Sequence, residues 1–282
     1  MAAPRTRRCA ALSDTGRRRK QNEDRYLCDG ERGLFAAIDG VGGQAAGEQA
    51  AQTALEVLAA RLERDTGTPA ERVREAITLA NNEIHQQAEG HPDWSGMACV
   101  LTVAVVVAGT VTVGHVGDTR LYKLRPDGLE KLTHDHSPIG ELEDTGQLTE
   151  REAMQHPRRN EIYRDVGGEP HTPEDEEFIE LLEASFEPDS ALLLSSDGLS
   201  DLVASAEIRG IVERHAAHPA RAVRELVDAA NRAGGRDNIT VVLVVGERYA
   251  AAVRRARRRG LWRRVAAGLE KRRKEPEHGS NS

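Results

Sequence analysis

The sequence is poor in aromatic residues, in cysteine and in long apolar runs. Aromatic residues make up 3% of its 282 residues, and its three cysteines are Cys9, Cys28 and Cys99. Their odd count and wide spacing exclude a disulfide scaffold and a four-cysteine metal site, and they favour a reducing compartment. The longest apolar stretch, at 98–108, is interrupted by Thr102 and is too short to cross a bilayer as a helix.

A targeting signal is also missing. The chain starts Met-Ala-Ala-Pro-Arg with no apolar segment behind it, and Ala2 excludes a myristoylation signal. We therefore expect a cytoplasmic protein. Hydrophobic residues make up 39% of the chain and charged residues 30%, which is the composition of a globular protein. A chain of this length can bury a sizeable core without disulfides or a structural metal.

The net charge of −7 is unevenly distributed along the chain. Residues 250–282 contain 11 Lys/Arg and 3 Asp/Glu, a net charge of +8. Residues 1–249, with 28 Lys/Arg and 43 Asp/Glu, therefore carry −15. An acidic body of this kind argues against nucleic acid as a partner and suits a protein that binds cations.

The basic tail, residues 250–282, also contains a few large apolar residues. They are Val253, Trp262, Val265 and Leu269. One interpretation is an amphipathic helix that makes peripheral contact with an anionic membrane surface or an acidic partner. The other is a solvated tail.

Hydrophobic periodicity predicts strands and helices in an irregular order. Strands are predicted at 26–28, 34–38, 98–108, 110–116, 120–124, 129–132, 178–182, 191–195 and 239–245. Helices are predicted at 51–62, from a capping box at 68–71, at 206–215 and at 220–233. Because strands and helices do not alternate regularly, antiparallel sheets with helices on the outer faces fit better than a doubly wound parallel sheet.

Aspartates recur where apolar strands are predicted to end. Asp39 and Asp197 each follow a fully apolar strand and precede glycine, Asp118 follows another strand, and Asp237 lies just before the last one. The Asp-Gly pairs at 29 and 127 differ, because each lies between two pairable strands and is typical of a hairpin turn. Four carboxylates converging at strand ends would repel one another unless divalent cations neutralised them, and oxygen ligands suit Mg²⁺ or Mn²⁺.

Seven short motifs occur in an order that resembles the metal-dependent protein phosphatases, the phosphatase 2C family, in its bacterial branch. They are Ser-Asp-x-Gly-x-x-Arg-x-x-Asn-Glu-Asp at 13–24, Asp-Gly-x-Gly-Gly at 39–43, Gly-Asp-Thr-Arg at 117–120, Leu-Thr-x-Asp-His-Ser at 132–137, His-Pro-Arg-Arg-Asn at 156–160, Ser-Asp-Gly-Leu at 196–199 and Asp-Asn-Ile-Thr at 237–240. Each motif is weak alone, but seven in one order are specific. The resemblance implies a two-sheet antiparallel sandwich with helices on both outer faces.

The resemblance also implies a set of metal ligands for two or three Mn²⁺ or Mg²⁺ ions per chain. Asp39 matches the carboxylate that bridges two metals, and the Gly40 carbonyl is expected to be a ligand as well. Asp197 and Asp237 match the remaining ligands of the first metal. Asp118 matches the position that, with Asp197, holds a third metal in bacterial members.

Three further residues from the N-terminal motif match functional positions of the family. Glu23 and Asp24 match the acid pair that reaches the metals directly or through water. Arg19 matches the arginine that binds the substrate phosphate, and a guanidinium suits the oxygens of a phosphoryl group. In this mechanism a water that bridges two metals attacks the phosphate directly, so no protein nucleophile is needed.

The proton donor for the leaving group is not assigned by these motifs. Many eukaryotic members have a histidine where this chain has Val41, which cannot donate a proton. Bacterial members often have an apolar residue there, so Val41 does not argue against activity. A metal-bound water is the preferred donor, and His134 and His136 are weaker candidates.

The resemblance implies a catalytic domain at 1–249, with a variable flap at 137–171, followed by the tail at 250–282. We expect a monomeric enzyme that hydrolyses phosphoserine and phosphothreonine on proteins and opposes a bacterial Ser/Thr kinase. The alternatives are a non-catalytic phosphoprotein-binding module on the same fold, and a phosphatase for small phosphate esters or one dedicated regulator protein. Retention of Asp39, Asp197 and Asp237 disfavours the non-catalytic module.

Overall fold

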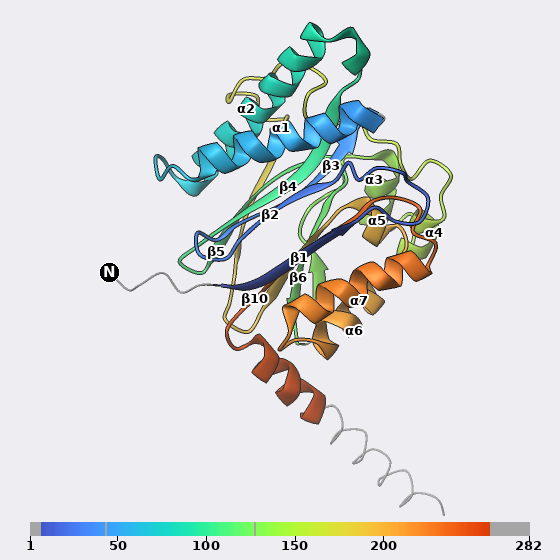
Figure 1. Ribbon diagram of the computed structural model, residues 1–282. Helices are drawn as coiled ribbons and strands as arrows, with labels where there is room; N and C mark the ends of the chain where they lie inside the picture. The colour runs from blue at the N-terminus through green and yellow to red at the C-terminus, as the bar shows by residue number, and fades with distance from the viewer. Residues whose placement is uncertain (1–6, 43, 127, 260–282) are drawn as a thin grey trace, which may run out of the picture.

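Two five-stranded antiparallel sheets stack on each other in the computed structural model, with helices on both outer faces (Figure 1). The structure describes residues 7–42, 44–126 and 128–259. The first sheet has the order β1 (Arg8–Asp14), β10 (Ile239–Val245), β9 (Ala191–Ser195), β6 (Arg120–Arg125) and β7 (Gly128–Lys131). The second has the order β2 (Arg25–Asp29), β3 (Leu34–Val41), β4 (Ala98–Val107), β5 (Thr110–Val116) and β8 (Glu180–Ser185).

Two helices cover each sheet. Helices α1 (Gln44–Leu62) and α2 (Pro69–Gly90) pack on the second sheet, and α6 (Ser205–Arg214) and α7 (Pro219–Arg232) pack on the first. The predicted capping box opens α2: Thr68 and Glu71 bond each other's backbone N–H. The short elements are η1 (Pro92–Trp94), α3 (Pro138–Asp144), α4 (Glu150–Met154) and α5 (Asp197–Ser200).

The central strands are apolar on both faces because each sheet is covered twice. Along β3, Ala36 and Ile38 face the helices, whereas Phe35 and Ala37 face the other sheet. All four are fully buried. A strand in this position reads as an unbroken apolar run rather than an alternating one. Complete burial of a side chain such as Phe35 contributes about 1.5–3 kcal/mol to folding.

The strand register brings several strand ends to one end of the sandwich. In the first sheet, Ser195 at the end of β9 pairs with Arg120 at the start of β6, and Asp14 at the end of β1 pairs with Ile239 at the start of β10. In the second sheet, Ile38 pairs with Arg25 at the start of β2. The loops that follow or precede these residues therefore emerge together.

Most predicted elements occur within one or two residues of their expected bounds, with four exceptions. Helix α1 begins at Gln44, seven residues before the predicted residue 51, and strand β3 continues to Val41, three residues beyond the predicted residue 38. Strand β1 was not predicted, because its small and polar residues give a weak pattern. Strand β8 begins two residues later than the predicted 178–182, since Phe178 and Ile179 are buried against the helices before the strand starts. The turn at Asp29 is a hairpin as predicted, whereas Asp127 lies outside the described residues.

The chain continues after β10 as a helix over 249–259 that packs against the first sheet's helices. Tyr249 and Val253 belong to that core and are 0% and 2% exposed. The interpretation of Val253 as part of an exposed apolar face of the tail is therefore wrong. Trp262, Val265 and Leu269 lie outside the described residues. No helix in the described ranges is both long and apolar enough to cross a bilayer.

Candidate metal and phosphate site

A small acidic cavity opens at the end of the sandwich where these loops meet. Its volume is ≈ 230 Å³, below the roughly 300–1,000 Å³ of pockets for drug-sized ligands. The residues that line it are Arg19, Glu23, Asp39, Gly40, Val41, Gly42, Val100, Asp118, Asn160, Ile162, Asp197 and Asp237. Seven of the eight residues predicted from the sequence are among them, and only Asp24 is not.

The carboxylates come from strands of both sheets. Asp39 is near the end of β3 in the second sheet, and Asp118 is in the turn between β5 and β6. Asp197 opens α5 directly after β9, and Asp237 precedes β10, both in the first sheet. The cavity therefore exists only when the two sheets are packed together.

Asp24 lies beneath this cavity rather than on its surface. It is 2% exposed, and its Oδ2 accepts a hydrogen bond from Ser196 Oγ at 2.8 Å. The same Ser196 oxygen accepts the N–H of Thr240 at 2.9 Å, so one hydroxyl connects β9, β10 and the acid. The sequence indicated Ser196 only as part of a motif and gave it no role.

Asn238 holds the loop that carries the arginines and acids. Its Oδ1 accepts the N–H of Glu23 at 2.8 Å, and its Nδ2 donates to the carbonyl oxygens of Gln21 and Thr15 at 2.9 and 3.0 Å. Asn238 is 3% exposed, and its buried amide pairs with three backbone groups of this loop. It fixes the loop to the start of β10.

The two glycines that follow Asp39 and Asp197 are required by close packing. A Cβ on Gly40 would lie 2.2 Å from the carbonyl oxygen of Gly47, and one on Gly198 would lie 1.9 Å from that of Asn238. No real Cβ tolerates such contacts. These Asp-Gly pairs therefore serve close backbone approach. The pair at Asp29 forms a hairpin turn, and its Gly30 also lies against the backbone of Arg7.

Burial and mutual repulsion raise the pKa values of the clustered acids. The pKa of Asp39 lies well above its usual range because of burial and the charges of Asp24 and Asp197. Burial also raises the pKa of Asp24 to about 6 and that of Asp118 to about 7, where Asp135 and Asp201 add repulsion. Such crowding disfavours the ionised carboxylates unless a cation compensates them.

The donor set fits divalent cations. Asp24 Oδ1 and Asp197 Oδ1 are buried and accept no hydrogen bond from any described residue. Buried carboxylate oxygens without a partner are costly, and coordination to a metal removes that cost. All the candidate ligands are oxygens, which is the preference of Mg²⁺ and Mn²⁺.

Arg19 lies at the rim of the cavity. Its Nη2 donates to Asp237 Oδ2 at 2.7 Å, and its side chain is 46% exposed. The guanidinium therefore has donors available both to the acids and to an anion that enters from solvent. Arg17 and Arg18 are also exposed but do not line the cavity.

The flap contributes residues whose roles the sequence did not assign. Asn160 and Ile162 line the cavity, and the neighbouring Arg159 donates from Nε to Asp201 Oδ2 at 2.7 Å. This ion pair fixes the flap to the end of α5. The motif at 156–160 indicated the segment, but only the structure shows which side chains reach the site.

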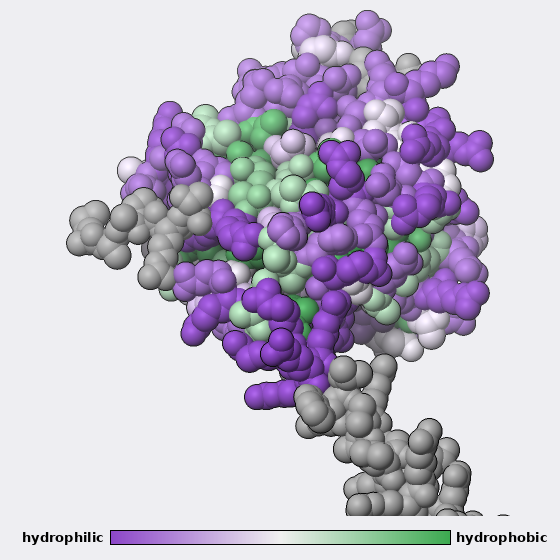
Figure 2. Space-filling view, turned by 60° about the horizontal axis from the view of Figure 1, so that its bottom comes forward, coloured by the Kyte–Doolittle hydropathy of each residue, from purple (hydrophilic) through white to green (hydrophobic). Residues whose placement is uncertain are grey.

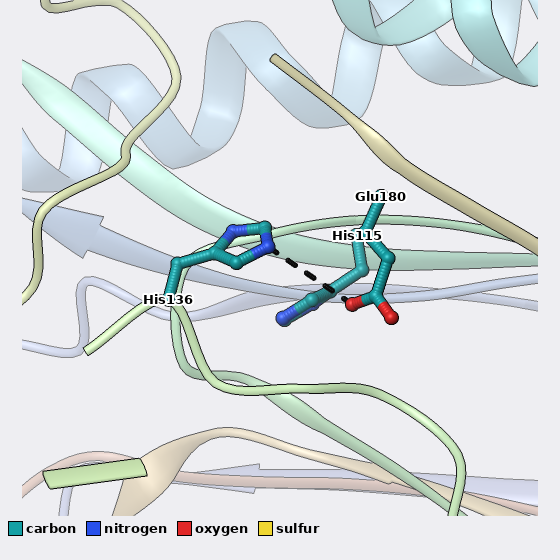
Figure 3. Close-up of side chains that lie close together, drawn as sticks. All are labelled: His115, His136 and Glu180. Carbon is teal, nitrogen blue, oxygen red and sulfur yellow. Dashed lines mark ion pairs between the residues drawn. The ribbon is translucent and has the colours of Figure 1, made fainter. Parts of the chain in front are cut away.

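His134 and His136 lie away from the cavity, in a separate group with His115 and Glu180. Figure 3 shows the ion pair between His136 and Glu180, at 4.0 Å. His134 Nδ1 is 2.6 Å from Glu180 Oε1, and burial lowers the pKa of His136 to about 3. The prediction that either histidine could donate the catalytic proton is therefore wrong, because neither lines the cavity.

This histidine group could hold a metal by its spacing, since ligand atoms of His115, His136 and Glu180 lie within 4.8 Å of one another. Both ring nitrogens of His115, however, already have protein partners. Nδ1 is 2.9 Å from Thr102 Oγ1 and Nε2 is 3.0 Å from the His134 carbonyl oxygen. The group thus has a complete hydrogen-bond network of its own, in contrast to the unpartnered oxygens of the acidic cavity.

Comparison with known proteins identifies the family. The family model described as protein phosphatase 2C matches residues 16–239. The serine/threonine phosphatase stp of Listeria innocua is 34% identical over 244 residues, which cover 82% of this chain and 93% of that protein. The chain belongs to the protein phosphatase 2C family, and the sequence prediction of this family is confirmed.

Solved structures agree with the fold. The serine/threonine phosphatase PstP/Ppp of Mycobacterium tuberculosis has a TM-score of 0.76 at 34% identity, covering 85% of this chain and 98% of that one. The catalytic domain of PstP in complex with two manganese ions has a TM-score of 0.74 at 33% identity, and the match covers 84% of this chain and 98% of that one. The predicted two-sheet sandwich is confirmed, and a phosphatase, rather than a non-catalytic module, is the class of protein defined by the family and fold.

The raised pKa values predict how the metal-free protein responds to pH. Because the folded state holds the Asp118 proton more tightly than the unfolded state does, stability falls as pH rises from about 4 through about 7. Asp118→Asn removes this penalty. In EDTA at pH 8 the Tm of Asp118→Asn should therefore exceed that of the wild type, by about 2–4 °C for each kcal/mol of repulsion that the substitution removes. At pH 5 the difference in Tm should be much smaller. Scanning calorimetry measures both values.

The matched control is Asp228→Asn, because Asp228 is exposed on α7. It should show the same small difference from the wild type at both pH values. An Asp118→Asn variant that is no more stable than the wild type at pH 8 would contradict the electrostatic description of the site.

Proposed function

We propose that this chain is a metal-dependent phosphatase that hydrolyses phosphoserine and phosphothreonine on proteins, with the acidic cavity as its active site. The observation that carries the proposal is the cluster of half-buried or buried carboxylates with unpartnered oxygens at Asp24 and Asp197. The relatives are named as serine/threonine phosphatases, and one neighbour was solved with two manganese ions. Both support the substrate class and the cofactor.

In this proposal Asp39, the Gly40 carbonyl, Asp197 and Asp237 hold two Mn²⁺ or Mg²⁺ ions. Two such ions supply an activated water at neutral pH and neutralise charge on the phosphoryl oxygens. Glu23 and Asp24 support the same ions from the N-terminal loop. Asp118 and Asp197, which both line the cavity, would hold a third cation.

Arg19 binds the phosphate in this proposal. It is the arginine of the run at 17–19 that lines the cavity, and its exposure leaves its donors accessible to the substrate. The ring of acids excludes a free dianion unless the cations are bound, so Arg19 and the cations bind the phosphate together. Among the described lining residues there is no histidine, so we assign the proton of the leaving alcohol to a water, as preferred from the sequence, rather than to a side chain.

The expected partners are phosphorylated proteins, including a Ser/Thr kinase and its substrates. Asn160 and Ile162 of the flap form part of the cavity wall, so a phosphoprotein whose phosphoryl group occupies the cavity would also lie next to the flap. The flap therefore has the position to select among phosphoproteins.

Removal of the bridging carboxylate should abolish turnover. With p-nitrophenyl phosphate and a phosphothreonine peptide as substrates, EDTA should stop hydrolysis and Mn²⁺ should restore it. Groups that only orient a ligand cost about 10–100-fold when removed. Asp39→Asn removes a ligand itself, so kcat should fall by more than about 100-fold, with Asp228→Asn as the control. Full turnover of Asp39→Asn with Mn²⁺ would exclude the metal assignment.

Loss of the rim arginine should mainly affect substrate binding. Arg19→Ala is expected to raise KM about tenfold or more and to lower kcat less, because the phosphate loses a contact present before the transition state. Arg17→Ala and Arg18→Ala are matched controls from the same loop and should leave KM within about twofold. Steady-state kinetics with p-nitrophenyl phosphate measure these values. An increase in KM for a control, with none for Arg19→Ala, would show that the wrong arginine was assigned.

We further propose that the basic tail makes peripheral contact with an anionic membrane surface. The supporting observation is a row of exposed arginines on the helix that begins at Tyr249: Arg254, Arg255, Arg257, Arg258 and Arg259. In Figure 2, hydrophilic residues gather at the end of this helix. Each basic residue near an anionic surface contributes about 1 kcal/mol.

The tail should bind vesicles without changing catalysis. The full chain should co-sediment with phosphatidylserine vesicles at low salt, and binding should weaken as salt shortens the Debye length from about 10 Å at 0.1 M. Truncation after Arg259 keeps the five arginines of this helix and removes the other six basic residues of the tail, so it should weaken this binding without abolishing it and leave p-nitrophenyl phosphate turnover within about twofold. A cut after Glu247 is unsuitable, because it removes Tyr249 and Val253 from the core. A strong rise in turnover on truncation would instead identify the tail as an autoinhibitor.

A further inference from the structure

Cys9 and Cys28 face each other at an open edge of the sandwich. Strand β1 is the edge of the first sheet and β2 is the edge of the second. Both cysteines point between the sheets and pack on the same central core. They are free thiols and only half-buried, so small reagents in solution can reach them.

The two edge strands approach each other much more closely than stacked sheets usually do. Face-to-face sheets pack about 10 Å apart, but the N–H of Arg7 donates to the carbonyl oxygen of Gly30 at 2.9 Å. A Cβ on Gly30 would lie 3.0 Å from Cys9 Sγ, so this sulfur lies directly against the β2 side. The Cys9 and Cys28 side chains are close enough for each thiol to alter the pKa of the other. This close approach suits the short span of a disulfide.

We propose that Cys9 and Cys28 are a site of oxidative modification, at which a hydroperoxide converts the two thiols into an intramolecular disulfide. The Cys9 thiolate attacks one peroxide oxygen, the O–O bond breaks, and the alkoxide or hydroxide that leaves takes up a proton. The resulting Cys9 sulfenic acid is attacked by the Cys28 sulfur, which loses its proton as water departs. Two thiols and one hydroperoxide give one disulfide, one alcohol or water, and one water.

The roles of the two sulfurs follow from the interaction between them. The neighbouring Cys28 thiol lowers the pKa of Cys9 to about 7, whereas the neighbouring Cys9 and burial raise the pKa of Cys28. Asp29, the nearby acid, opposes the effect on Cys9 but does not reverse it. A thiolate is the reactive form, so Cys9 is the attacking residue and Cys28 the resolving one.

Cys99 provides an internal control. It lies on β4, is fully buried on the face toward the helices, and burial raises the pKa of its thiol. It belongs to a different core cluster from Cys9 and Cys28. A hydroperoxide should therefore not modify it in the folded protein.

The disulfide would close a chain segment that matters to the site. Residues 9–28 comprise all of β1 except its first residue, the loop with Arg19, Glu23 and Asp24, and most of β2. A covalent link at the base of this loop restricts the unfolded chain and holds the two strands together. Formation of the bond does not depend on the proposed function, and its test uses no phosphatase assay.

The test treats the full folded chain with hydrogen peroxide, alkylates the remaining thiols and digests without reduction. Trypsin cleaves between the two cysteines, so mass spectrometry should find peptides 9–17 and 26–32 joined, with the loss of two hydrogens. Cys99→Ser should give the same product. Cys28→Ser should stop at a Cys9 sulfenic acid that dimedone traps, and dithiothreitol should return the wild type to free thiols.

A second readout is stability. Oxidised wild type should have a higher Tm than the reduced protein, and Cys9→Ala and Cys28→Ala should show no such difference. If Cys28 of the peroxide-treated, folded wild type remains open to alkylation, the proposal is overturned. A disulfide between two chains, seen as a dimer on a non-reducing gel, would overturn it as well.

Discussion

The central physical constraint on this structure is that several carboxylates of like charge are held together where the two sheets meet. Asp24, Asp39, Asp118, Asp197 and Asp237 belong to strand ends or loops of both sheets, and several raise one another's pKa. No local element could hold them together, because isolated carboxylates would separate and hydrate. The apolar burial of β3, β4, β9 and β10 provides the free energy that opposes this repulsion. The site is therefore a property of the assembled sandwich.

The residues around the carboxylates are as specific as the carboxylates themselves. Ser196 and Asn238 satisfy buried groups of Asp24 and of the Glu23 loop, and Gly40 and Gly198 allow backbones to touch. A change at any of them would move an acid by tenths of an ångström or leave a polar group unpaired, and positioning errors of that order are costly at a catalytic site. This explains why the motifs consist of several residues rather than of single aspartates.

The central strands and the acids could be predicted from the sequence for one physical reason. Strands covered on both faces are apolar throughout, so the polar residue that ends each run, such as Asp39 or Asp197, is conspicuous. Strand β1 was not predicted from the sequence, because its half-buried edge position tolerates small and polar residues. The contribution of Asn160 could not be predicted, since it depends on how an irregular flap folds over the sheets, and the distance of His134 from the cavity depends on the irregular loop after β7. Val253 was misassigned because a basic helix can bury one face in its first turns and expose the other.

Cation binding and folding must be coupled in such a protein. Any ion that binds the folded state and not the unfolded one adds stability in proportion to the logarithm of its concentration over its dissociation constant. The folded state of this chain contains the repulsion between the carboxylates, and the unfolded state does not, so bound cations remove a cost that exists only after folding.

The N-terminal loop with Arg19, Glu23 and Asp24 is the segment on which this coupling acts most directly. It is anchored to β10 by Asn238, and its two ends continue into the edge strands β1 and β2, which meet near Gly30. Any change in how tightly these edge strands are joined therefore acts on the same loop that must accommodate both the cations and the phosphate.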